Sequence, residues 1–188
     1  MVDTAIQTPG MEEVIDEEEL GSMIDLFLNE GGTFQDLHGL SDKEMEAVYG
    51  IAYTLYESGK YEEALQVFQF LCFNNHYEKR YWVGLGATQQ MRKAYEEALQ
   101  AYAFAAVMDL DDPSIPLHAA RCCMALERFK DAEKSLEAAS ALAEDKAEHA
   151  DTKARADALL ELVVILEPDR PAADCFAVLP LAMLALAE

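Results

Sequence analysis

The sequence contains three segments that align with one another at a spacing of 34 residues: Tyr61-Glu-Glu-Ala-Leu-Gln-Val-Phe68, Tyr95-Glu-Glu-Ala-Leu-Gln-Ala-Tyr102 and Phe129-Lys-Asp-Ala-Glu-Lys-Ser-Leu136. Each segment begins with an aromatic residue and ends with a large apolar one. An alanine follows three residues after each first aromatic, at Ala64, Ala98 and Ala132. A fixed period of this kind indicates a stack of similar units, none of which can bury its apolar face alone.

This spacing is the period of the tetratricopeptide repeat, in which each unit is a helix-turn-helix. The composition favours the same fold, because Gly (9) and Pro (6) are scarce and hydrophobic residues make up 52% of the chain. We therefore predict an all-α protein with three tandem tetratricopeptide repeats at about 45–78, 79–112 and 113–146. An N-terminal helical segment precedes the repeats in this prediction, and a C-terminal helix caps them.

Shifts in composition predict five parts along the chain. These are a disordered acidic N-terminus, a helical segment, the repeat domain, a capping helix and an apolar tail, at residues 1–11, 12–40, 41–147, 148–167 and 168–188. The tail is short for a membrane span, which needs ~20 apolar residues. A packed or self-docking tail is favoured over a membrane contact, but both interpretations stay open.

Charge and motif content argue against several classes of function. The 14 Lys+Arg and 36 Asp+Glu give a formal charge of −22, so we expect neither nucleic-acid binding nor stable membrane binding. The 4 histidines are scattered, and no pair among the 4 cysteines has the Cys-x-x-Cys spacing. We therefore predict no metal site, no cofactor and no enzymatic activity. The first 20 residues lack a basic segment followed by an apolar one, which favours the cytoplasm.

Two stripes of side chains on the predicted helix at residues 41–58 separate packing from binding. At about 100° per residue, one stripe places apolar residues at the helix-packing positions of the repeat, namely Val48, Ile51, Ala52 and Leu55. The same positions of the later repeats hold Trp82, Leu85, Gly86, Ala119, Ala120 and Cys123. We predict that these residues form the core between the helices.

The second stripe consists of Tyr49, Tyr53 and Tyr56, which lie roughly a quarter turn away from the first. The first helix of each pair lines the concave face of such a stack, so we predict a peptide-binding groove there. Equivalent positions add Val83, Ala87, Gln90, Met91, Leu117, Arg121 and Met124. Aromatic, small and flexible side chains together suit an extended, partly apolar peptide. A tyrosine stripe can also be plain core, but here a different stripe already fills the core positions.

Short segments beyond the repeat pattern carry a more specific signal. They are Phe27-Leu-Asn-Glu-Gly-Gly-Thr33, Leu55-Tyr-Glu-Ser-Gly-Lys-Tyr61, Gly84-Leu-Gly-Ala87, Ala106-Val-Met-Asp-Leu110, and Pro116-Leu-His-Ala-Ala120 followed by Cys122. Over about residues 20–165, the chain resembles the class II chaperones of type III secretion systems, the LcrH/SycD/IpgC-type translocator chaperones. Because tetratricopeptide repeats occur in many unrelated proteins, these segments and not the repeat carry the resemblance.

The resemblance implies a non-catalytic cytoplasmic bacterial chaperone that binds hydrophobic translocator proteins and keeps them soluble and unassembled before secretion. In that family an extended client segment with a Pro-x-Leu-x-x-Pro pattern lies in the concave groove, which here implies Tyr49, Tyr53, Tyr56, Ala87, Gln90 and Arg121. Family members often form homodimers through the N-terminal helical segment. This implies residues 12–40 here, with Ile24, Phe27 and Leu28 at the interface.

A general repeat scaffold that binds peptide segments of other proteins is the alternative function. Such scaffolds often clamp a terminal carboxylate with several Lys, Arg and Asn side chains. Arg121 is the main basic residue at a predicted groove position, and the tyrosines favour apolar anchors instead. Sequence alone leaves this alternative open.

Overall fold

The computed structural model describes residues 21–22, 25, 31–144 and 146–166, and the chain divides into two compact units between Ser41 and Asp42. The predicted N-terminal segment 1–11, the tail 168–188 and the predicted dimer residues Ile24, Phe27 and Leu28 lie outside the described residues. The first unit contains a one-turn helix, α2 (Phe34–Leu37), which begins with a capping box. The Thr33 hydroxyl accepts a hydrogen bond from the Asp36 N–H, and the Asp36 carboxylate accepts one from the Thr33 N–H (2.8 Å).

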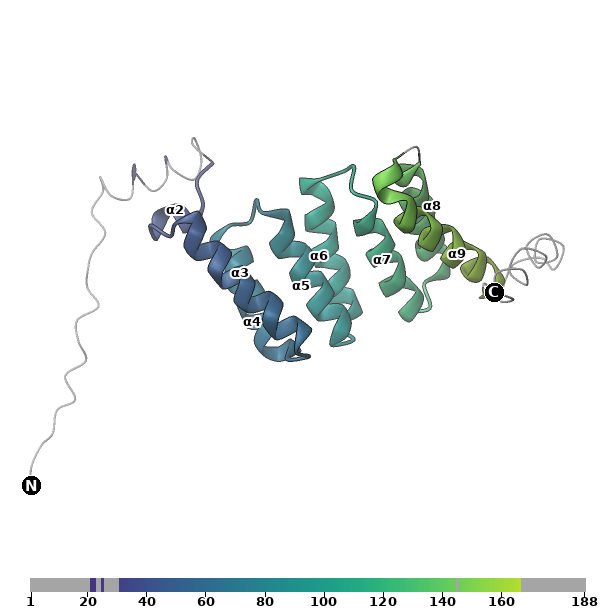
Figure 1. The fold of residues 1–188 in the computed structure, drawn as a ribbon, viewed down its shortest axis with the longest axis horizontal. Coiled ribbons are helices and arrows are strands. Elements are labelled where there is room, and N and C mark those ends of the chain that lie inside the picture. The colour runs from purple at the N-terminus through teal and green to yellow at the C-terminus, as the bar shows by residue number, and fades with distance from the viewer. Residues whose placement is uncertain (1–20, 23–24, 26–30, 145, 167–188) are drawn as a thin grey trace, which may run out of the picture. The chain divides into compact units, whose positions relative to one another are not determined.

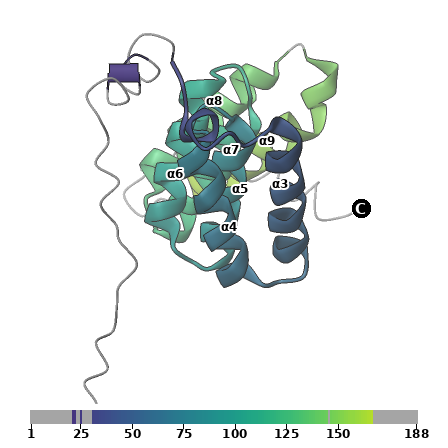
Figure 2. The same cartoon turned by 90° about the vertical axis from the view of Figure 1, so that its left-hand side faces the viewer.

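The second unit is built from helices that follow one another through short connections. They are α3 (Asp42–Glu57), α4 (Tyr61–Asn74), α5 (Lys79–Met91), α6 (Tyr95–Met108), α7 (Ser114–Ala125), α8 (Phe129–Ala143) and α9 (Ala150–Leu166), with a 3₁₀ turn at Ala147–His149. Neighbouring helices lie side by side in chain order (Figure 1), and α4 and α6 lie on one side of α3 and α5 (Figure 2). The described residues contain no strand, which confirms the prediction of an all-α chain.

The residues that repeat every 34 positions form the packing between the paired helices. Ala64, Ala98 and Ala132 are all 0% exposed, and the large residues that close the three segments are also buried, at Phe68, Tyr102 and Leu136. Small residues on the facing helices permit the close approach. A Cβ added to Gly84 would lie 2.2 Å from the Phe68 ring, and one added to Gly86 would lie 2.7 Å from the Tyr102 ring.

The predicted core stripe of α3 is correct at one position and wrong at another. Ala52 is 0% exposed, whereas Ile51 is 56% exposed and contributes nothing to the core. The reason is that α3 is the first helix of its unit and packs almost entirely against α4, so one face of it stays in water. On α5, Trp82 is half-buried; its Nε1 donates to the His76 carbonyl (2.8 Å) and its ring stacks on Phe104.

The C-terminal helix α9 covers the last pair, as a capping helix of a repeat array does. Its Ala156 and Val163 are buried in a cluster that includes Ala132 and Leu136 of α8. The Ser140 hydroxyl of α8 donates to the Asp157 carboxylate of α9 at 2.5 Å. Among the helices described, none has both the length and the apolar character that a membrane span requires.

Candidate peptide-binding groove

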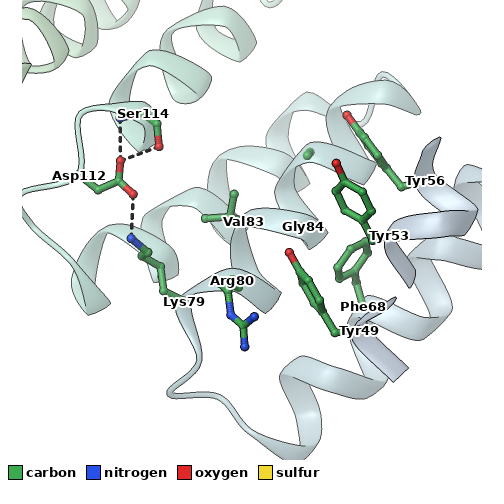
Figure 3. A pocket seen from close by; sticks show the side chains of 11 residues that line it. Tyr49, Tyr53, Tyr56, Phe68, Lys79, Arg80, Val83, Gly84, Asp112 and Ser114 are labelled. Atoms are coloured by element: carbon green, nitrogen blue, oxygen red, sulfur yellow. Dashed lines mark hydrogen bonds and ion pairs between the residues drawn. The ribbon is translucent and has the colours of Figure 1, made fainter. Parts of the chain in front are cut away.

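A cavity of ≈ 240 Å³ opens between α3, α4 and α5, and the start of α7 contributes to its edge. We call it the tyrosine pocket. Its apolar wall consists of Tyr49, Tyr53, Tyr56, Phe68, Val83, Gly84 and Ala87 (Figure 3). Its polar edge consists of Lys79, Arg80, Asp112 and Ser114. The helical spacing of the three tyrosines on α3 is what brings their rings to one side of the cavity.

Aromatic contacts hold Tyr49 at the centre of this wall. Its ring centroid lies 6.1 Å from that of Phe68 in an edge-to-face arrangement and 5.8 Å from that of Tyr81. The Tyr53 ring stacks on the Tyr49 ring with 6.5 Å between their centroids, but Tyr53 itself is 49% exposed. Such ring pairs stabilise a structure by more than the burial of their apolar surface alone would. The wall is therefore ordered in advance, with Tyr53 as the ring presented to a ligand.

The hydroxyls of Tyr53 and Tyr56 stay neutral over the physiological pH range, because the pKa of each is raised. Hydrogen bonding with Glu57 and its negative charge raise the pKa of Tyr53, and burial raises the pKa of Tyr56. A neutral phenol can donate one hydrogen bond and accept others. The wall therefore offers apolar ring faces together with uncharged hydroxyls, a combination that suits the side chains and the backbone of an extended peptide.

The floor of the tyrosine pocket depends on the small residue Gly84. Its Cα lies so close to Phe68 that a side chain at this position would overlap the ring. The Phe68 ring, which is 2% exposed, lines the cavity beside Tyr49 and Tyr53. Because Ala87 follows one turn later on α5, the floor is shallow and entirely apolar.

The two cations at the edge of the tyrosine pocket are both paired with carboxylates. Lys79 Nζ donates to Asp109 and to Asp112 at 2.8 Å each, and these hydrogen bonds raise the pKa of Lys79. The Arg80 guanidinium binds Glu46 (3.0 Å) and Glu78 (3.2 Å) and lies 5.0 Å from the Tyr49 ring centroid. Neither cation is therefore available to clamp a terminal carboxylate without losing an existing partner.

Half of the predicted groove residues come together in this one cavity. Tyr49, Tyr53, Tyr56, Val83 and Ala87 line it. Gln90 lies outside the lining, where its Oε1 accepts a hydrogen bond from the Tyr102 hydroxyl (3.0 Å). Met91 at the end of α5 and Arg121 on α7 are exposed and also lie outside the lining.

One predicted groove residue is buried in the hydrophobic core, and a second is half-buried against it. Leu117 is only 5% exposed, within the cluster formed by α7, α8 and α9, and Met124 packs against the same cluster. The prediction transferred the groove positions of α3 to α7 by repeat register alone. In the structure α9 covers the last pair and contacts α7, so a side chain that would be open on an uncovered helix is buried here.

The lining also contains residues that no sequence pattern marks as part of this site, namely Phe68, Lys79, Arg80, Gly84, Asp112 and Ser114. The repeat pattern marks Phe68 only as the large apolar residue that ends the first segment, whereas its ring also lines the cavity. The polar edge joins the start of α5 to the α6–α7 connection, and the Asp112 carboxylate also accepts a hydrogen bond from the Ser114 hydroxyl (2.6 Å). No short-range pattern marks such an edge, because Lys79 and Asp112 lie 33 positions apart in the sequence and meet only in the folded chain.

The chain matches a family profile and is similar in sequence to known proteins. The tetratricopeptide repeat family profile matches residues 45–77 and 81–112, which confirms that the chain contains tetratricopeptide repeats. Low calcium response locus protein H of Yersinia pestis is 37% identical over 152 residues, which cover 81% of this chain and 90% of that protein.

Solved structures agree with the sequence relatives. A type III secretion system complex from Aeromonas hydrophila contains a chain that is 37% identical, with a TM-score of 0.75, covering 79% of this chain and 99% of that one. PcrH of Pseudomonas aeruginosa, in a complex with the chaperone-binding region of PopD, is 42% identical with a TM-score of 0.65, covering 66% of this chain and 94% of PcrH. The all-α repeat fold, the level of identity and the near-complete coverage of these relatives agree, and the chain belongs to the family of class II type III secretion translocator chaperones.

Proposed function

We propose that this protein is a chaperone that binds hydrophobic translocators of a type III secretion system and keeps them soluble and unassembled before secretion. Family membership supports the proposal, since PcrH is a relative whose structure includes the chaperone-binding region of PopD. We further propose that the protein acts in the bacterial cytoplasm, where translocators await export, and that it works by binding alone.

The observation that carries this proposal is the ordered tyrosine wall beside a floor without charge. An extended segment with a Pro-x-Leu-x-x-Pro pattern presents rigid, apolar side chains and lacks a backbone N–H at two of its six positions. Aromatic-lined grooves bind such segments at low entropic cost. We assign the client contacts to Tyr49, Tyr53, Tyr56, Val83 and Ala87, with Phe68 and Gly84 as the floor.

The energetics of such binding favour a reversible complex. Burial of apolar surface contributes ~25 cal/mol per Å², and the ordering of a disordered client segment offsets much of this gain. Moderate affinity suits a protein that must hold a client and later release it intact. No covalent step or nucleotide is required for either event.

A peptide titration tests the proposal with a matched pair of variants on α3. Tyr53→Ala removes the most exposed ring of the tyrosine pocket, and Ile51→Ala removes a similar apolar side chain that is exposed outside it. We expect Tyr53→Ala to weaken binding of a Pro-x-Leu-x-x-Pro peptide by about tenfold or more, as for an aromatic residue at an interface centre. Ile51→Ala should bind as the unmodified protein does.

Isothermal titration calorimetry with a synthetic peptide is the measurement. Equal losses in both variants would mean that the tyrosine pocket is not the binding site. The same peptide with an amidated C-terminus tests the scaffold alternative, because a carboxylate clamp would lose affinity and the tyrosine pocket would not.

A further inference from the structure

A second cavity, of ≈ 450 Å³, lies on another part of the repeat array, between α6, α7 and α8. We call it the α6–α8 pocket. Its lining is almost entirely apolar and includes Leu99, Ala106, Leu110, Pro116, Ala119 and Ala138. The three helices are neighbours in chain order (Figure 1). Asp112 also contributes to the edge of the tyrosine pocket, whereas none of these apolar lining residues does.

The 34-residue period explains why this cavity exists. One repeat earlier, the positions of Pro116, Ala119 and Ala138 are occupied by Trp82, Leu85 and Phe104. The Trp82 and Phe104 rings stack there at 4.6 Å between centroids, so the two rings cover the space between the helices. In the α6–α8 pocket a proline and a methyl group replace the two rings, and the lost volume stays open.

The open space is a place for a large apolar side chain from elsewhere. An apolar hollow of this size, filled only by water, forgoes favourable contacts that an aromatic or branched side chain would make. The edge of the pocket carries Asp109 and Asp112, which both bind Lys79, and also Lys134, which is exposed and forms no ion pair with any described residue. An occupant with an aromatic ring and a nearby carboxylate would therefore match both the hollow and its edge.

The chain itself carries such a segment directly after α9. Residues 172–187 contain one charged residue, Asp174, and one aromatic residue, Phe176. These two lie two positions apart, the spacing at which a carboxylate could reach Lys134 while the ring enters the pocket.

The connection from α9 is long enough. Since Ser140 of α8 bonds to Asp157 of α9 and a short connection joins the two helices, they run antiparallel. Leu166 therefore lies near the first turn of α8. Position 138 is about 14 Å further along that helix from Phe129. The ten residues from 167 to 176 can span up to about 33 Å when extended, so the pocket is within reach of the same chain.

We propose that the C-terminal segment 168–188 docks in the α6–α8 pocket of its own chain, with Phe176 in the place that Phe104 takes one repeat earlier. Docking covers apolar surface that would otherwise attract a second copy or another protein. The proposal stands apart from the client-binding function, because it uses a different cavity and needs no client.

Disulfide formation with the native Cys175 tests the proposal on the full chain. Ala138→Cys places a thiol in the α6–α8 pocket, and Ala158→Cys places one on an exposed position of α9 as the matched control. Background reaction is low because Cys72, Cys122 and Cys123 are buried, and burial raises the pKa of Cys72 and of Cys122 to about 12. Under mild oxidation we expect a disulfide within one chain for Ala138→Cys and little for Ala158→Cys, identified by peptide mass.

A disulfide that forms only in the Ala158→Cys variant would mean that the tail packs along α9 instead. Disulfides between two chains would assign the pocket to a second copy, and the absence of any disulfide would leave the tail undocked; all three results overturn the proposal.

A filled-pocket variant gives an independent readout. Ala138→Phe copies the residue of the preceding repeat, and position 138 is exposed, so the fold should tolerate the ring. We expect the alkylation rate of Cys175 to rise several-fold relative to the unmodified chain, with unchanged circular dichroism. An unchanged alkylation rate would show that the tail does not occupy this pocket.

Discussion

Tyr49 and Tyr53 lie one helical turn apart on α3, but only one of them is held by the fold. Tyr49 contacts Phe68, Tyr81 and the Arg80 guanidinium, whereas about half of the Tyr53 side chain is open to water. The sequence predicts both as a single stripe because helical spacing is a local property. Which ring packs and which is presented depends on α4 and α5, and no pattern within α3 contains that information.

This difference predicts unequal effects on stability. Tyr49→Ala should lower the free energy of unfolding by about 1–3 kcal/mol, because it removes several aromatic contacts at once. Tyr53→Ala should change it by less than about 0.5 kcal/mol, as for an exposed position. Urea unfolding followed by circular dichroism measures both values. Similar losses for the two variants would contradict the assignment of distinct roles.

Two glycines of the first helices provide a second test at the residue scale. Gly84→Ala should destabilise the protein by about 1–3 kcal/mol, because the new methyl group overlaps Phe68. Gly50→Ala on α3 is the control, since an added Cβ there meets nothing within 4 Å. It should stabilise the helix by about 0.5–1 kcal/mol. Thermal melts of both variants measure these changes in stability. An unchanged melting temperature for Gly84→Ala would show that Phe68 can move away freely.

Among the helices, α5 is held by ion pairs that connect its first turn to the segment between α6 and α7. Lys79 binds Asp109 at the end of α6 and Asp112 just before α7, and both carboxylates thereby tie the start of the second predicted repeat to its end. The bounds of α3 follow from sequence, since the helix predicted at residues 41–58 agrees with Asp42–Glu57 within one residue at each end. The tie does not follow, because its three residues are spread over more than thirty positions.

This tie predicts a pH dependence of stability. The hydrogen bond from Lys79 lowers the pKa of Asp109; burial raises that of Asp112, but the bonds from Lys79 and Ser114 outweigh it and the pKa is lowered. A carboxylate with a lowered folded pKa stabilises the protein above its unfolded pKa, and this stability is lost as the pH falls through the folded pKa. The pairs should therefore contribute at neutral pH and fade below about pH 4.

Lys79→Met measures this contribution, and Lys43→Met on α3 serves as the control at a lysine that is not part of the tie. The difference in urea midpoint between the unmodified protein and Lys79→Met should be largest near neutral pH and should shrink in acid. A pH-independent difference would assign the effect to the lysine methylenes and not to the ion pairs.

For the whole molecule, the predicted homodimer concerns a segment that precedes the repeat unit. The family resemblance assigns the interface to residues 12–40, and the chain divides into two units at Ser41 and Asp42. We therefore expect the full chain to be a dimer in light scattering and the chain without residues 1–40 to be a monomer with the same helical content per residue. A shortened chain that remains dimeric would place the interface on the repeats.

The sequence by itself determined the helices, their pairing and the tyrosine stripe, because a 34-residue period and a helical spacing are visible wherever the residues repeat. It also carried the family resemblance through short segments such as Gly84-Leu-Gly-Ala87. Only the tertiary structure decided that α9 buries Leu117, that Lys79 meets Asp112 at the tyrosine pocket, and that a hollow opens beside Ala138. These features arise from contacts between residues far apart in the chain, where the size of one side chain sets the space left for another.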